Sequence, residues 1–343
     1  MALSALPVNC QSLLQHLLDC NFELLLIGGG ARALLDGEPL PTDLDFELRH
    51  SQQLADEQWL SFVSDHFDKI VSQYSCRLQK LKFGVCRIEL DGCSLEFASP
   101  RIESFIDCDT GHSNFTVAVA NQFDNTIAFS RRDFTFNAFA WCFAHNLSSP
   151  ALVDPFGGVD DWQKKLLRPC SEFCHRDPVR LLRAVRFEQK YDLIKSSNFL
   201  LQLPSFNLQQ LSGHYFLRES SKVHFGQFLR RLATIVVEYS LPIPSYLSLL
   251  FRAMHDQQLG TCASIKETLF LLAVEQQIIE TEFYSIVEQL CLGKKASRKI
   301  WDLAKCVVDG KIDRTSAINS LTKAEKSHAT HCSERSSQRS EIN

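Results

Sequence analysis

A short apolar run that ends in glycines, followed by an alternating acidic segment, most constrains how this chain folds. Residues 24–27 are all Leu or Ile and lead into Gly28, Gly29 and Gly30. Residues 43–48 then alternate polar and apolar side chains, which is the pattern of a half-buried strand. Two strands separated by a glycine-rich segment predict a mixed α/β unit in the first half of the chain.

Further patterns extend this unit. Residues 84–90 and 94–98 read as strands, and they flank the dipeptide Asp91-Gly92, which favours a tight hairpin turn. The spacing of apolar residues predicts helices over three segments, 52–67, 134–143 and 177–191.

Few strand signals appear in the second half, where helical spacing recurs from about residue 196. Residues 323–343 are polar with hardly an apolar side chain, so we expect a disordered tail. The predicted fold class is α+β, with an N-terminal head at 1–162, a helical neck and body at 163–322 and the tail at 323–343.

The charge distribution is more informative than the net charge of −4. Residues 1–162 hold 10 Lys and Arg against 22 Asp and Glu, whereas residues 163–343 hold 26 against 18. An acidic half suits a site that collects divalent cations, and a basic half suits a polyanionic partner such as RNA.

Composition also bears on the compartment. The 13 cysteines show no Cys-x-x-Cys pairs, which favours reduced thiols over a disulfide framework. No export signal is visible, and the apolar runs are shorter than the roughly 20 residues that cross a bilayer. We therefore expect a cytoplasmic protein with no membrane partner.

The glycines and acids have a chemical interpretation. Glycines after a strand let backbone N–H groups approach phosphates, and the next helix presents its positive N-terminus to the same anion, where Arg32 could pair with a phosphate oxygen. Alternate residues of a strand point the same way, so Asp43 and Asp45 can share a pair of Mg²⁺ ions. This arrangement suits nucleotidyl transfer.

Further segments strengthen that interpretation. Residues 131–138 read Arg-Arg-Asp-Phe-Thr-Phe-Asn-Ala, and residues 154–161 fit Asp-Pro-x-Gly-Gly-x-x-Asp. Residues 177–187 combine an Asp with three arginines, and Glu96 is followed by a Pro-Arg-x-Glu segment and Gly111-His112. In this order the motifs resemble those of class II CCA-adding tRNA nucleotidyltransferases and bacterial poly(A) polymerases, within the polymerase-β superfamily, over about residues 20–195.

The resemblance implies template-independent addition of C and A from CTP and ATP to the 3′ end of tRNA. It implies that Asp43 and Asp45 ligate two Mg²⁺ ions, with Glu96 as a third carboxylate nearby. The family's phosphate and nucleotide contacts map onto four residues, Gly28, Gly29, Arg32 and Arg132.

Base selection is assigned to the helix that starts near Asp177. Steps of three residues place Asp177, Arg180, Arg183 and Arg186 on neighbouring positions of one helix face. An acceptor beside a donor can read the Watson–Crick edge of cytosine or adenine, and the remaining arginines would bind the triphosphate.

Two departures from the family pattern and several alternatives remain. Ala33 stands where the family has Asp, and Arg176 stands where it has Glu before the selecting helix. A poly(A) polymerase, or an enzyme that adds only CC or only A, shares the same head motifs. A non-catalytic RNA-binding protein with the same fold is the alternative from another class, and the sequence leaves the oligomeric state open.

Overall fold

The computed structural model describes residues 3–52, 54, 56–105, 115–119, 121, 123–253, 262–275 and 278–321. The chain divides into two compact units, Met1–Arg176 with Leu193–Gln202 and Asp177–Asp192 with Leu203–Asn343. The boundary follows Arg176, later in the chain than the head boundary predicted at residue 162, and the functional division at 162 stays a prediction. The predicted tail and the Gly111-His112 dipeptide lie outside the described residues.

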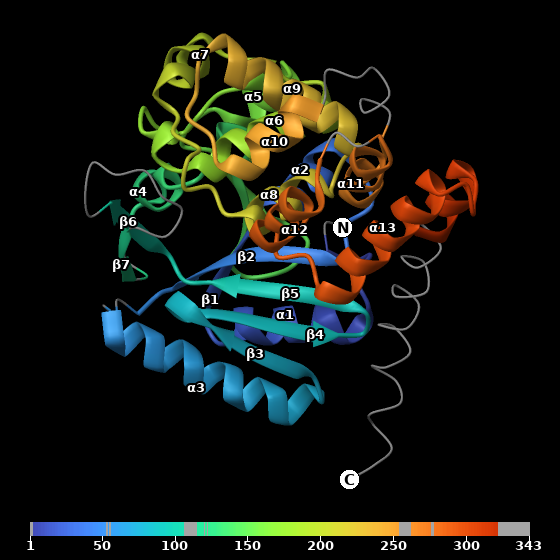
Figure 1. Ribbon diagram of the computed structural model, residues 1–343. Helices are drawn as coiled ribbons and strands as arrows, with labels where there is room; N and C mark the ends of the chain where they lie inside the picture. Colours follow the sequence, from blue (N-terminus) through green and yellow to red (C-terminus); the bar gives the residue numbers. More distant parts are fainter. Residues whose placement is uncertain are drawn as a thin grey trace. The chain divides into compact units, whose positions relative to one another are not determined.

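The first unit is built on a seven-stranded mixed sheet with strand order β3-β4-β5-β2-β1-β8-β9 (Figure 1). Strands β2 and β5 pair in parallel, and the other neighbours pair antiparallel. The strands are β1 (Phe22–Ile27), β2 (Asp43–His50), β3 (Arg77–Leu81), β4 (Val85–Leu90), β5 (Cys93–Ala98), β8 (Ala140–Phe143) and β9 (Ala151–Val153).

Two small sheets complete the strands of this unit. The antiparallel pair consists of β6 (Arg101–Phe105) and β7 (Phe115–Val119), and the parallel pair consists of β10 (Leu166–Leu167) and β11 (Ile194–Lys195). The helices are α1 (Val8–Asp19), α2 (Gly28–Asp36), α3 (Asp56–Tyr74), α4 (Asn125–Ser130), α5 (Gly158–Gln163) and α7 (Ser197–Gln202). Short 3₁₀ turns are η1 (Lys82–Gly84), η2 (Thr135–Asn137) and η3 (Cys174–Arg176).

The alternation along β2 separates the core from the polar face of the sheet. Leu44, Phe46 and Leu48 point into the main hydrophobic core, which also takes side chains from α1 and α3. Figure 1 shows α1 and α3 along this side of the sheet. Asp43 and Asp45 occupy the alternate positions and are exposed, so they lie on the opposite face.

Most of the predicted elements of the head are confirmed. The two strands around Asp91-Gly92 are β4 and β5, and both turn residues have positive φ, 49° and 78°, as a tight hairpin requires. The helix predicted over 52–67 exists as α3, although it begins and ends later. The predicted α+β class is confirmed.

The helix predicted over 134–143 is wrong. Residues Thr135–Asn137 form a 3₁₀ turn, and Ala140–Phe143 form β8, which pairs antiparallel with β1. Phe134, Phe136 and Phe139 are all almost fully buried, so the apolar spacing reflects burial on several sides. Periodicity cannot separate such a segment from a buried helix.

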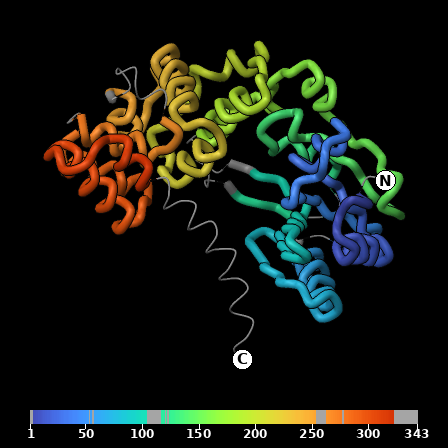
Figure 2. Tube along the Cα trace, turned by 90° about the vertical axis from the view of Figure 1, so that its right-hand side faces the viewer, coloured from blue at the N-terminus to red at the C-terminus, as the bar shows by residue number. Residues whose placement is uncertain are grey.

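Every regular element described in the second unit is a helix, and Figure 2 follows the later ones from yellow to red. They are α6 (Pro178–Tyr191), η4 (Leu203–Ser205), α8 (Gly213–Ser220), α9 (Phe225–Glu238), α10 (Ser245–Ala253), α11 (Ile265–Val274), α12 (Glu280–Gln289) and α13 (Lys294–Val308). In the described part of the chain, no helix combines the length and the apolar character that a membrane span needs.

Candidate active site

The two carboxylates predicted to bind metal lie on the polar face of β2. Asp43 is the first residue of the strand, and Asp45 follows two positions later on the same face. Both are exposed, while Leu44 between them is buried. The strand therefore presents two carboxylates side by side and anchors them through a core residue.

Glu96 is the neighbour of Asp45 across the sheet. The parallel register of β2 and β5 pairs Asp45 with Glu96. Glu96 in turn accepts hydrogen bonds from Arg87 on β4, with 2.6 Å between Oε2 and Nη2. The structure thus brings the third predicted carboxylate beside the first two, but with a guanidinium already bound to it.

The glycine segment approaches Asp45 directly. Gly28 begins α2 with φ of +64°, a conformation that favours glycine. A Cβ at this position would lie 3.5 Å from Oδ2 of Asp45. The N-terminus of α2, where the first backbone N–H groups of a helix have no partner within the helix, is therefore next to Asp45.

Arg132 supplies positive charge to the same place. Protein atoms around Asp45 and the neighbouring Glu96 raise the pKa of its carboxyl, although the side chain reaches solvent, and the Arg132 guanidinium partly offsets that rise. Arg132 lies over the Phe129 ring at 5.3 Å and donates from Nη1 to the Asn137 carbonyl at 3.4 Å. Its Nε has no hydrogen-bond partner among the described residues.

Arg32 contacts Asn137, the residue to which Arg132 also donates. Its side chain is buried, donates to Oδ1 of Asn137 and lies over the rings of Phe136 and Trp162, at 5.5 and 5.2 Å from their centroids. These contacts fasten α2 to the segment that follows Arg132. In this structure Arg32 contacts protein groups, and its contact with phosphate stays a prediction.

A buried polar network joins η2 to α5. Thr135 donates from its hydroxyl to Asp161, and Asp161 accepts from Arg168 Nε at 2.8 Å. Asp154 accepts from the backbone N–H groups of Gly158 and Val159 and so caps α5. The acids of the Asp-Pro-x-Gly-Gly-x-x-Asp motif therefore fix the scaffold rather than line the carboxylate pair.

The carboxylate pair suits Mg²⁺ by its donor chemistry. Magnesium is commonly held by one or two carboxylates together with substrate phosphates and water, and not by an all-protein cage. Among the described residues no group of three or more His, Cys, Asp or Glu side chains could hold an ion. Desolvation and the negative charges of Glu96 and Asp43 raise the pKa of Asp45, and a bound cation would offset the repulsion from those two carboxylates.

The predicted base-selecting residues belong to the second unit. Asp177 is the N-cap of α6, and its Oδ1 accepts from the Val179 backbone N–H at 2.9 Å. Its Oδ2 is 3.9 Å from Nε of Arg180, which is itself buried. Asp177 and Arg180 are therefore adjacent, as predicted, and the cap fixes the orientation of the acid.

The other two arginines of α6, Arg183 and Arg186, differ in burial and in the groups they contact. Arg186 is buried and pairs with Oε2 of Glu219 on α8 at 2.8 Å, and Glu219 is fully buried. Arg183 lies 5.3 Å from the Phe187 ring and is half-buried. Sequence reasoning missed Glu219, because only the packing of α8 on α6 makes it the partner of Arg186.

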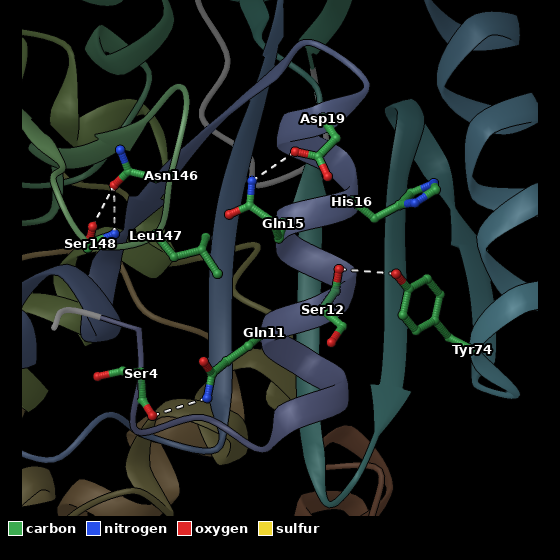
Figure 3. A pocket seen from close by; sticks show the side chains of 10 residues that line it. All are labelled: Ser4, Gln11, Ser12, Gln15, His16, Asp19, Tyr74, Asn146, Leu147 and Ser148. Carbon is green, nitrogen blue, oxygen red and sulfur yellow. Dashed lines mark hydrogen bonds between the residues drawn. The ribbon is translucent and has the colours of Figure 1, made fainter.

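A separate polar pocket of 630 Å³ opens beside α1 (Figure 3). It is lined by Ser4, Gln11, Ser12, Gln15, His16, Asp19, Tyr74, Asn146, Leu147 and Ser148. Several of these groups bond one another, as in the 2.9 Å contact of Gln15 with Asp19. None of the predicted site residues lines this pocket.

The first half of the chain matches a known family. Residues 24–168 match the poly(A) polymerase head domain. A CCA-adding enzyme of Pediococcus pentosaceus is 25% identical over 225 residues, which is 64% of this chain and 50% of that protein. A multifunctional CCA protein of Xylella fastidiosa is 47% identical over 57 residues, 17% of this chain and 13% of that protein. The matches thus span half the length of these relatives or less.

Solved structures agree on the fold. A CCA-adding enzyme in an apo form aligns with a TM-score of 0.61 at 20% identity, over 89% of this chain and 73% of that one. The Thermotoga maritima CCA-adding enzyme in complex with tRNA aligns with a TM-score of 0.58 at 20% identity, over 94% and 77%. Residues 24–168 thus match the poly(A) polymerase head domain, and the chain shares the fold of solved CCA-adding enzymes.

Proposed function

We propose that this chain adds C and A nucleotides from CTP and ATP to the 3′ end of tRNA. The observation that carries the proposal is the juxtaposition of Asp43 and Asp45 with the N-terminus of α2. One face of the head thereby offers carboxylates for a cation and backbone N–H groups for a triphosphate.

The chain's own groups then have distinct roles. Gly28 and Gly29 let the triphosphate approach the backbone at the start of α2, and Arg132 neutralises phosphate charge beside Asp45. Asp43 and Asp45 hold two Mg²⁺ ions, which when bound supply charge neutralisation and activation of the RNA 3′-hydroxyl. Glu96 adds negative charge next to Asp45, and its ion pair with Arg87 fixes its position.

The C-terminal half of the chain would provide selectivity and RNA binding. Asp177 and Arg180 stand together at the start of α6 and offer an acceptor and a donor to a base edge. The excess of basic residues over 163–343 suits the phosphates of a tRNA. Solved relatives described as complexes with CTP, ATP and tRNA support these partners for this chain.

One assay tests the proposal and separates it from its alternatives. The purified chain is given tRNA transcripts that end before CCA, after the first C and after CC, with each labelled nucleotide in turn. Addition of C to the first two and of A to the third supports the proposal.

Other outcomes identify other enzymes. Long A tails on any RNA would mark a poly(A) polymerase, and addition of only C or only A would mark a partial enzyme. RNA binding without incorporation would mark a non-catalytic protein. Asp43→Ala, which removes a carboxylate from the exposed face without disturbing the core, serves as the inactive control.

A further inference from the structure

A third acid follows Asp43 and Asp45 on the same face of β2, and it is completely buried. Glu47 stands two positions after Asp45 and has no solvent exposure. A buried carboxylate is costly unless charged or hydrogen-bonding partners surround it. The groups that pair with Glu47 therefore indicate the structural role of its charge.

The first partner is Arg49, on the same strand. Its Nη2 donates to Oε1 of Glu47 at 2.9 Å and to Oδ1 of Asn125 at 3.1 Å. Its Nη1 donates to the carbonyl oxygen of Phe123. Through Arg49, the carboxylate holds the residues where α4 begins.

The second partner is Arg131, the residue that follows α4. Its Nη2 lies 3.6 Å from Oε2 of Glu47, and its Nη1 lies 3.9 Å from Oε1 of Glu103, which also pairs with Arg101. Burial and the nearby Arg132 and Arg101 lower the pKa of Arg131 to about 10, and Glu47 and Glu103 oppose that shift. Arg131 thus stays charged at neutral pH.

These contacts tie both ends of α4 to the catalytic strand. Arg49 secures the beginning of the helix and Arg131 secures its end, with Glu47 between them. Arg132 comes directly after Arg131, so the position of its guanidinium follows from where Arg131 is held. Packing alone would fasten α4 as well, since Ala128 and Phe129 are buried against Leu25 and Ile27.

We propose that Glu47 is a positioning residue that, through Arg131 and Arg49, fixes Arg132 in the nucleotide site beside Asp45. The proposal rests on the proposed function, because it assigns Arg132 to the triphosphate. Replacing buried ion pairs with apolar groups is often neutral or stabilising, so stability alone does not call for a charge here. The role we assign to the charge of Glu47 is orientation: its ion pairs with Arg49 and Arg131 fix the direction in which the Arg132 side chain extends.

The test measures the affinity of the full-length chain for CTP in the presence of Mg²⁺ and without RNA, by calorimetry. Glu47→Gln keeps the shape of the side chain and removes its charge. We expect about tenfold weaker CTP binding, because a displaced Arg132 loses a charge-assisted contact with phosphate, and a loss of about 1.4 kcal/mol corresponds to tenfold in affinity.

The decisive comparison uses the Arg132→Ala background. If Glu47 acts through Arg132, then Glu47→Gln has no further effect on CTP affinity once Arg132 is gone. An equal loss in both backgrounds, or no loss in either, would overturn the proposal. Asp68→Asn is the matched control, because it removes the charge of an exposed ion pair with Lys80 in the same unit and should leave CTP affinity unchanged.

Two further measurements separate a failure of the positioning role from loss of folding and from failure of the proposed function. If Glu47→Gln fails to fold by circular dichroism, the double variant Glu47→Gln/Arg131→Gln removes both charges and should fold with the same loss of affinity. A double variant with wild-type affinity would refute the positioning role. A wild-type chain that binds CTP but adds nothing to tRNA would defeat the proposed function alone, whereas a wild-type chain that binds no CTP would defeat both.

Discussion

The Asp45 carboxyl is the titrating group that links chemistry to stability in the head. Surrounding protein atoms, Glu96 and Asp43 raise its pKa above the ordinary 3.8, so the folded state binds this proton more tightly than the unfolded state does. Ionisation of Asp45 therefore costs stability as the pH rises through its folded pKa.

Asp45→Asn should consequently abolish nucleotide addition while raising the Tm at pH 7. This gain in Tm should narrow as the pH falls toward 3.8, the ordinary pKa of an aspartate. Thermal unfolding at several pH values measures this difference. Glu57→Gln, on the exposed side of α3, should leave the Tm unchanged, and a lower Tm for Asp45→Asn would contradict the assigned direction of the pKa shift.

Single residues also show what sequence reasoning can and cannot reach. Asp43, Asp45, Glu96 and Gly28 were predicted to converge, and the register of β2 with β5 and the close approach of Gly28 to Asp45 bring them together. The burial of Arg32 could not be predicted, because its aromatic neighbours come from residues more than a hundred positions later. Such contacts depend on the tertiary fold.

In α6, Asp177 both caps the helix and is proposed to select the base. Asp177 accepts from the Val179 N–H, so Asp177→Ala removes both the cap and the acceptor for a base edge. We expect it to cost about 1 kcal/mol of stability and to relax discrimination for CTP and ATP over UTP and GTP by roughly 5- to 150-fold.

Asp177→Ser separates these two roles. Serine caps helices well, so stability should return to near the wild-type value while selectivity stays relaxed. Single-nucleotide incorporation and chemical denaturation measure the two quantities. Restored selectivity in Asp177→Ser would show that Asp177 acts on base choice only through the cap.

The junction between η2 and α5 depends on a close approach of two backbones. A Cβ on Gly158 would overlap the carbonyl oxygen of Thr135, so Gly158→Ala must push α5 away from η2. We expect a loss of about 1–3 kcal/mol, measured by urea denaturation. Gly293→Ala adds a methyl group where nothing lies within 4 Å, and it should be nearly neutral. Equal stability of the two variants would contradict the packing argument.

Elements with a strong local signal were predictable, and those defined by pairing were not. Asp91-Gly92 specifies a hairpin locally, and the N-cap Asp177 followed by Pro178 specifies the start of a helix. Segment 134–143 has no such signal, because its strand forms through pairing with β1 and β9, which are distant in the sequence or follow it. Its phenylalanines fit a buried helix equally well.

At the scale of the molecule, the opposite charges of the two halves predict a salt-dependent RNA affinity. If residues 163–343 bind several phosphates, the logarithm of tRNA affinity should fall linearly with the logarithm of salt concentration, by about 0.7–0.9 per phosphate. Filter binding at four salt concentrations gives the slope. A tRNA affinity that does not change with salt concentration would contradict the assignment of residues 163–343 as the RNA-binding region.

The backbone passes between the two units more than once, which limits how proteolysis or truncation can separate them. The backbone leaves the first unit after Arg176, returns to it at Leu193 and leaves again after Gln202. Three covalent connections therefore join the units, and α6 is tethered to the first unit at both of its ends. A protease that cuts one connection leaves the other two intact, so the units cannot be released as separate fragments by a single cleavage. Expression of residues 1–176 alone would also omit β11 and α7, leaving Phe134 without its edge-to-face partner Phe199.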